Sequence, residues 1–322
     1  MTTMLLNGRG SFPAFAALIA ANVIYATSYA AGRVALDGMP AALLAFTRLL
    51  IAALLMLPVL RRSARGPALS RREFWSVAGM GIVGFGAAFW LGNWGIALST
   101  TTNAAILVVV EPIVIMLLGP ILLGERLSSR EAFGAAMAVA GSLVVVVNGV
   151  PGLQGFHGKL LPHWRGDALL VLTGIAFASY SLWGRPLLER HDAKRVTALS
   201  LWWGVAALLP LAVLEWARGR RPEWTWPSSA ATLYLAVAVT AIGFFLWNWA
   251  LKRVEASRAA ITLNIQPVLG SLLGVLWLKE RMTVFTIFGG LLIVSGLFVA
   301  FHQRSRDQSA RAAGENGGAY GI

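Results

Sequence analysis

Apolar and polar positions follow one another along this chain in long blocks. Apolar stretches of roughly 20 residues recur between short polar segments, and a helix of that length spans a hydrocarbon core of about 30 Å. We place ten such helices, with boundaries good to a few residues, at 12–35, 40–60, 74–98, 102–124, 131–150, 166–188, 195–216, 229–251, 257–279 and 283–302. The pattern predicts an all-α integral membrane protein.

Composition and charge support this class. Of the 322 residues, 57% are hydrophobic and 13% are charged, whereas about 25% of the residues of a soluble domain are charged. The formal net charge is +13, but the basic residues lie in short segments between apolar stretches, where Lys and Arg set the orientation of a membrane protein. They are more numerous in the segments that are cytoplasmic when the N-terminus is inside. We therefore expect both termini in the cytoplasm and no nucleic-acid partner.

The chain contains an internal repeat. Residues 89–141 align without a gap to residues 244–296: FWLGNW matches FFLWNW, NAAI matches RAAI, LGER matches LKER, and about a third of the aligned positions are identical. More weakly, IYATSYAAGR (24–33) resembles AFASYSLWGR (176–185). We divide the chain into a first copy (12–150), a loop (151–165), a second copy (166–302) and a polar cytoplasmic tail (303–322).

Each copy holds five predicted helices, and an odd number inverts the second copy relative to the first. Inverted repeats with polar residues near the middle of the membrane are typical of secondary transporters, which alternate around a site between the repeats. The sequence therefore predicts two inverted five-helix repeats around a central cavity.

Two charged residues lie deep in the predicted helices, Arg48 and Glu111. Each lies eight or nine residues from the start of its helix, roughly 12–14 Å deep at 1.5 Å per residue, so the two could meet. Burial in lipid is costly for such residues, and three interpretations of Glu111 stay open. It pairs with Arg48 and orders the helices, it binds a substrate amino group while Arg48 binds a carboxylate, or it carries a coupling proton. The aligned second-copy residues are Trp203 and Gln266.

Pro112 and its aligned partner Pro267 each predict a kink near the middle of the membrane. Proline lacks the backbone N–H that bonds four residues back, and its ring clashes with the preceding turn. The kinks serve helix shape or act as hinges.

Aromatic and amide side chains share helix faces in several spans, which suits a small amphipathic ligand. Simple packing and interfacial anchoring by Trp are the alternatives. The cavity candidates, besides Glu111 and Arg48, are Asn22, Tyr25, Phe89, Trp90, Asn93, Phe177, Tyr180, Asn264 and Gln266. Charges at helix ends reach water cheaply, so we interpret Glu125, Arg126, Glu280 and Arg281 as structural or gating residues.

Nothing in the sequence favours an intramembrane enzyme. The four histidines (157, 163, 191 and 302) lie in predicted loops or at a helix end, the chain has no Cys, and no HExxH or Walker motif occurs. We expect no metal, no cofactor and no catalysis. A passive channel stays open as an alternative, although inverted repeats suit alternating access better.

The stretches AAILVVVEPIVIMLLGPILLGERLSSREAFGAAMAVAGSLVVV and AAITLNIQPVLGSLLGVLWLKERMTVFTIFGGLLIVSGLFV resemble the two copies of the EamA domain of the drug/metabolite transporter superfamily. The resemblance covers nearly the whole chain. It implies a ten-helix carrier of the bacterial inner membrane with both termini cytoplasmic. The second copy departs from the common form at Gln266, where Glu-Pro is frequent, and at Lys279, where Gly is frequent.

The resemblance further implies an exporter of small amphipathic metabolites. Amino acids are the favoured substrate class, aromatic ones among them; sugars, nucleotide-sugars, drugs and quaternary ammonium compounds are the alternatives. The expected partners are a small-molecule substrate and the lipid bilayer, with protons left open as the coupling ion. We expect a monomer or a weak dimer.

Overall fold

The computed structural model describes residues 8–63, 68–123, 129–147, 163–253, 262–263, 265–280, 282–296 and 298–299. Within these ranges the regular elements are helices, and no strand is present. Most of the predicted loop and the whole tail lie outside the described residues, as do Glu125, Arg126, Asn264 and Arg281. We call the described residues up to 147 the first half and those from 163 the second half.

The first half begins with two long helices, and its third span changes helix type along its length. Its elements are α1 (Gly8–Leu36), α2 (Ala41–Ser63), α3 (Arg71–Gly79), η1 (Met80–Ala87), α4 (Ala88–Leu98), α5 (Thr101–Leu107), α6 (Val110–Leu123) and α7 (Ser129–Val147). α3, η1 and α4 are continuous, so they form one rod with a π-helical segment in its middle.

The second half repeats this order. Its elements are α8 (Trp164–Arg190), α9 (Ala193–Ala217), α10 (Trp226–Tyr234), η2 (Leu235–Gly243), α11 (Phe244–Leu251), α13 (Ile265–Leu276) and a last helix over Val284–Gly296. Across the described residues, seven helical spans are long and apolar enough to cross a membrane, and three further apolar helices are shorter. The helical membrane class predicted from the sequence is thereby supported.

The predicted proline kink of the first half is a break in the helix. α5 ends at Leu107 and α6 begins at Val110, with a turn between them. The backbone N–H of Glu111 donates to the carbonyl of Val108 at 3.0 Å, three residues back instead of four. Because Pro112 cannot donate to the α-helical ladder, the chain changes its hydrogen-bond pattern just before the proline.

The second half has the same irregularity at the aligned position. The backbone N–H of Gln266 donates to the carbonyl of Leu263 at 3.0 Å, again three residues back. α13 begins at Ile265, two residues before Pro267. Both copies therefore change hydrogen-bond pattern at the residue that precedes the proline.

The two π-helical segments also correspond. η1 and η2 lie directly before α4 and α11, which carry the matching FWLGNW and FFLWNW stretches. π-helical turns are rare and occur frequently at functional sites. Each packs on helices of the other half, η1 on α8 and α9, and η2 on α1 and α2.

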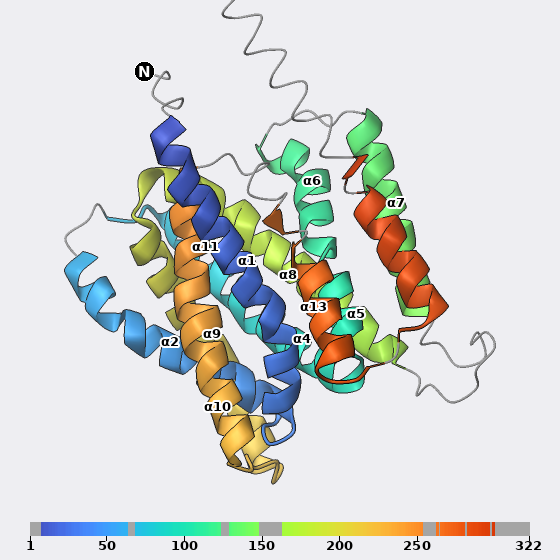
Figure 1. Ribbon diagram of the computed structural model, residues 1–322. Coiled ribbons are helices and arrows are strands. Elements are labelled where there is room, and N and C mark those ends of the chain that lie inside the picture. Colours follow the sequence, from blue (N-terminus) through green and yellow to red (C-terminus); the bar gives the residue numbers. More distant parts are fainter. Residues whose placement is uncertain are drawn as a thin grey trace, which may run out of the picture.

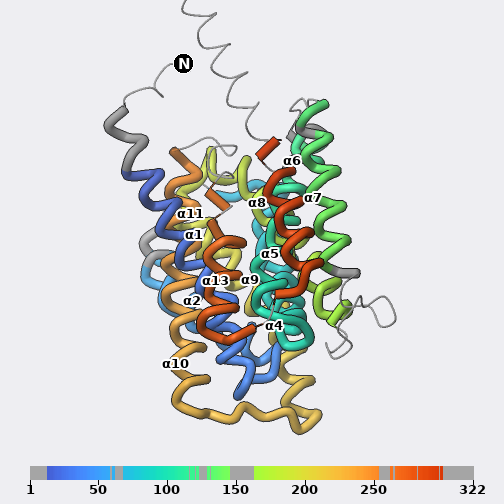
Figure 2. The backbone as a smooth tube through the Cα atoms, turned by 45° about the vertical axis from the view of Figure 1, so that its right-hand side comes forward, coloured from blue at the N-terminus to red at the C-terminus, as the bar shows by residue number. Residues whose placement is uncertain are grey.

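The two halves interlock along the whole bundle (Figures 1 and 2). α2 packs against α9, α8 against α4 and α6, α1 against α13, and α5 against α13. The most extensive helix packing therefore joins one half to the other, and this interface is where a central cavity can form.

At one edge of the bundle, α7 and the last helix run side by side (Figures 1 and 2). A Cβ on Gly289 would lie 2.7 Å from the carbonyl oxygen of Gly141, and one on Gly296 would lie 2.5 Å from that of Gly134. The alignment matches Gly134 with Gly289 and Gly141 with Gly296, so the two contacts are related by the repeat. Small residues let helix backbones approach this closely.

We expect Gly289→Ala to destabilise the protein, because its new methyl group meets backbone atoms that cannot move aside. Overpacking of this kind costs about 1–3 kcal/mol, which the midpoint of thermal unfolding in detergent reports. The matched control is Gly290→Ala on the same helix, whose Cβ would lie 3.5 Å from its nearest neighbour on Ile106. The control should unfold at or slightly above the wild-type midpoint; equal midpoints for the two variants would contradict the close contact.

Candidate binding cavity

A cavity lies between the two halves, lined by residues of α1, α2, α4, α5, α6, α8, η2, α11 and α13. Eight of the residues predicted from the sequence line it: Tyr25, Arg48, Phe89, Asn93, Glu111, Phe177, Tyr180 and Gln266. Their helices come from both copies of the repeat. The cavity is therefore shared between the halves.

Two predicted cavity residues do not line it. Asn22 is buried behind the wall, where it hydrogen-bonds Gln266, and Trp90 stacks on Trp94 with ring centroids 5.6 Å apart. The lining also includes residues that the candidate set lacked: Ser28, Tyr29, Thr173, Ser181, Phe244 and Trp247. The alignment matches Trp247 with Gly92, which also lines the cavity, but neither position was among the candidates.

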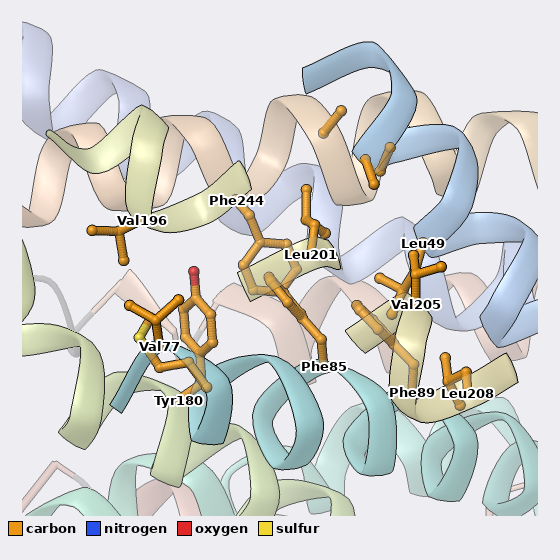
Figure 3. Packing of buried hydrophobic residues seen from close by; sticks show 14 of the residues in the cluster. Leu49, Val77, Phe85, Phe89, Tyr180, Val196, Leu201, Val205, Leu208 and Phe244 are labelled. Carbon is orange, nitrogen blue, oxygen red and sulfur yellow. The ribbon is translucent and has the colours of Figure 1, made fainter. Parts of the chain in front are cut away.

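Aromatic side chains form one wall of the cavity, and Figure 3 shows Phe85, Phe89, Tyr180 and Phe244 packed close together. The Phe244 ring contacts Phe89 and Phe177 edge-on or tilted, with centroids 6.1 and 6.4 Å apart. Behind them lies Phe85, whose ring centroid is 4.8 Å from those of Phe244 and Tyr180. This continuous aromatic layer presents apolar surface to whatever occupies the cavity.

Arg48 brings a guanidinium group to this wall. Its side chain is 5% exposed, its Nε donates to the hydroxyl of Thr240 at 2.6 Å, and its Cζ lies 3.9 Å from the centroid of the Phe89 ring. A guanidinium has five N–H donors, and these two contacts leave the donors of both terminal nitrogens without a partner among the described residues. Arg48 can therefore still hydrogen-bond a carboxylate through both terminal nitrogens.

Glu111 brings the opposite charge. Its Oε1 accepts one hydrogen bond, from the hydroxyl of Ser181 at 3.3 Å. An ionised carboxylate can accept about four hydrogen bonds, so most of the capacity of Glu111 is unfilled within the described part of the chain. The group can accept hydrogen bonds from a cationic ligand.

The structure does not favour the interpretation of Glu111 as a partner of Arg48. Both residues lie within the described ranges and line the same cavity, but no ion pair joins them there. The physical reason is that Thr240 and Phe89 hold the guanidinium, while Glu111 bonds toward α8. The two residues lie at one cavity, as their similar depth in the membrane suggested, but they are not in contact.

Gln266, aligned with Glu111, is held quite differently. Its Oε1 accepts from the hydroxyl of Tyr29 at 2.9 Å, and its Nε2 donates to Oδ1 of Asn22 at 2.8 Å. Asn22 in turn donates to Thr262 at 2.8 Å. Both ends of the Gln266 amide are therefore used to join α1 to α13, and the group has less to offer a ligand than Glu111.

The comparison with known families agrees with this architecture. The model of the EamA-like transporter family matches residues 12–147 and 164–301. The chain belongs to this family. It is a transporter rather than an enzyme, and its two matched segments correspond to the two halves of the structure.

Several curated relatives carry transport names. A probable terminal-alkyne amino-acid exporter of Streptantibioticus cattleyicolor is 28% identical over 88% of this chain and 91% of its own length. The uncharacterized transporter YetK of Bacillus subtilis is 25% identical over 94% and 91%. A probable amino-acid metabolite efflux pump of Escherichia coli is 25% identical over 57% and 62%. A crystal structure with a TM-score of 0.62 and 21% identity, covering 92% of this chain and 98% of that one, shares the fold.

One end of this EamA-family bundle is held together by carboxylates of the second half. Glu280 accepts from the backbone N–H groups of Thr101 and Thr102 at 2.7 and 2.8 Å, and from the Thr102 hydroxyl at 2.7 Å. Glu215 accepts from the N–H groups of Ala42 and Leu43, both at 3.0 Å. The first N–H groups of a helix lack intrahelical partners and attract negative charge, so each carboxylate caps a first-half helix. We call this the Glu280 end.

A buried carboxylate strengthens the same end. Asp167 is fully buried and accepts from Ser99 and, at 3.2 Å, from the amide of Asn103, both in the first half. Nδ1 of His163 lies 2.7 Å from its other oxygen. At the Glu280 end, polar bonds therefore join the two halves.

We expect Glu280→Gln to loosen the Glu280 end, because a neutral amide with one acceptor oxygen replaces two charged acceptors. Since the chain has no cysteine, Ser28→Cys supplies a single label inside the cavity. Loss of charged hydrogen bonds should speed labelling by an impermeant maleimide from the Glu280 side roughly tenfold. The control is Glu189→Gln, an exposed carboxylate of α8, which should leave the rate unchanged. Identical rates in both variants would show that Glu280 does not hold this end shut.

Proposed function

We propose that this transporter exports amino acids with apolar or aromatic side chains. The observation that carries the proposal is the pair of opposite charges with unfilled hydrogen-bonding capacity, Arg48 and Glu111, in one aromatic-walled cavity. Arg48 would bind the substrate carboxylate through its terminal nitrogens, and Glu111 would accept hydrogen bonds from the α-ammonium group. The aromatic wall of Phe89, Phe177 and Phe244 would receive the side chain.

Cationic drugs, quaternary ammonium compounds and sugars would each leave part of this cavity unused. A cationic drug or a quaternary ammonium compound would use Glu111 and the aromatic rings but would leave the guanidinium of Arg48 buried without an anion. A sugar would need neither charge. The names of two relatives, an exporter of terminal-alkyne amino acids and an amino-acid metabolite efflux pump, also favour a zwitterion.

The transport mechanism we propose is alternating access in the bacterial inner membrane. Ten spans, with both termini cytoplasmic, would place the Glu280 end outside the cell. The two repeats (12–150 and 166–302) would tilt around the cavity, with Pro112 and Pro267 as hinges and the Glu280 end opening when substrate leaves. The working unit would be a monomer or a weak dimer.

Glu111→Gln tests the ammonium site. In proteoliposomes, we expect the KM for leucine or phenylalanine counterflow to rise at least about tenfold, because a hydrogen bond to a charged group is lost. Repeating the assay with and without a pH gradient separates the roles: a gradient dependence that the variant loses at unchanged KM would make Glu111 a proton carrier instead. Glu73→Gln, at a carboxylate that does not line the cavity, is the control and should transport like the wild type.

Arg48→Gln tests the carboxylate site. We expect the KM for amino acids to rise at least about tenfold, while the corresponding decarboxylated amines inhibit counterflow as well as they inhibit the wild type or better. Arg253→Gln, which removes an exposed arginine, is the matched control. If the wild type transports amines but not amino acids, the cationic-drug alternative is favoured. The absence of any amino-acid counterflow would overturn the proposal.

A further inference from the structure

We propose that Thr240 is a positioning residue that aims the Arg48 guanidinium at the substrate carboxylate. The inference rests on the proposed function, because it assigns a role to the group that holds Arg48. Thr240 belongs to η2 of the second half and is fully buried. It does not line the cavity, so it would act on substrate through Arg48.

The hydrogen bonds of Thr240 have a fixed direction. Its hydroxyl donates to the carbonyl of Leu235 at 2.8 Å, which uses its one hydrogen. The same oxygen must therefore act as the acceptor for Nε of Arg48, 2.6 Å away. A hydroxyl anchored in this way offers Arg48 a lone pair at a defined point and cannot turn to compete as a donor.

The π-helical geometry of η2 makes this anchoring possible. In an α-helix, a Thr hydroxyl bonds back to the carbonyl three or four residues earlier. Here the acceptor is five residues earlier, as the wider π-helical turn permits. Thr232 on the preceding α10 shows the ordinary pattern, since its hydroxyl donates to Ser228 at 2.8 Å, four residues back.

Thr240 and Phe89 together determine the orientation of the guanidinium. The centroid of the Phe89 ring lies 3.9 Å from Cζ of Arg48, and the Thr240 hydroxyl accepts a hydrogen bond from Nε. With its face and its Nε edge occupied, Arg48 keeps the edge with the two terminal nitrogens, and this edge can bind a carboxylate with two parallel bonds. A second-half residue thus aims a first-half cation.

The aligned position in the first copy argues against a general structural need for this hydroxyl. Continuing the repeat alignment back along the third span matches Thr240 with Phe85, which is buried in the aromatic layer. The same register matches Arg48 with Trp203, so the repeat-related pair of positions, Phe85 and Trp203, has neither the hydroxyl nor the cation. The hydroxyl and the guanidinium therefore face each other at one of the two repeat-related sites and are both absent from the other.

The test compares Thr240→Val, which keeps the side-chain shape and removes the hydroxyl, with Thr240→Ser, which keeps the hydroxyl. Thr232→Val is the matched control, because it removes a buried back-bonding hydroxyl from the same span without touching Arg48. Each protein is purified, checked for a single gel-filtration peak and assayed by leucine or phenylalanine counterflow. Thr240→Ala replaces Thr240→Val if the valine variant does not purify as a single species.

We expect Thr240→Val to raise KM about tenfold with the maximal rate within about twofold of wild type, and Thr240→Ser and Thr232→Val to stay near the wild-type KM. Inhibition by a decarboxylated amine should be the same in all four proteins, since the amine does not use Arg48. An unchanged KM in Thr240→Val, or an equal rise in Thr232→Val, would overturn the inference. If Arg48→Gln also leaves KM unchanged, or if the wild type shows no counterflow, the proposed function fails as well.

Discussion

Lipid solvates an apolar helix about as well as another helix does, so the two halves of this chain must be held together by close packing and by polar bonds. Glycines make the packing possible. At the edge of the bundle the backbones of α7 and the last helix meet at two repeat-related contacts, one of which joins Gly141 and Gly289. The carboxylates of Glu215 and Glu280 add polar bonds across the interface. The cavity exists because these contacts pair each half with the other.

This enclosure lets the protein keep two charges at membrane depth, but it stabilises them unequally. An Arg near the middle of a membrane costs at least about 2.5–3.5 kcal/mol on insertion scales. A hydrogen bond to a charged group contributes about 1.5–3 kcal/mol, and a desolvated cation–π contact about 2 kcal/mol. Thr240 and Phe89 can therefore offset most of the cost of Arg48. Glu111 has one long hydrogen bond, so it is the group that gains more from a ligand.

The sequence predicted the helical membrane class, the repeat and the positions where proline interrupts the helices, because these depend on composition and on local backbone chemistry. It did not predict which residues touch. Arg48 and Glu111 were placed at one depth from helix rise alone, yet contact also depends on how each helix is rotated and tilted by its neighbours. Thr240 was missed for a related reason: a single hydroxyl in an apolar stretch gives no signal until the π-helical turn and Arg48 are seen beside it.

The difference between Glu111 and Gln266 follows from what lies opposite each one. Gln266 faces both a donor, the Tyr29 hydroxyl, and an acceptor, Oδ1 of Asn22, and an amide satisfies both where a carboxylate could accept from the first but not donate to the second. The alignment of 24–33 with 176–185 matches Tyr29 with Ser181. Extended by two residues toward the N-terminus, it also matches Asn22 with Gly174. At Glu111 the acceptor is therefore missing: a Cβ on Gly174 would instead lie 3.2 Å from the Glu111 backbone nitrogen. A Gln at this position would present the N–H donors of its amide to the cavity. A carboxylate instead presents the acceptors that an ammonium group requires.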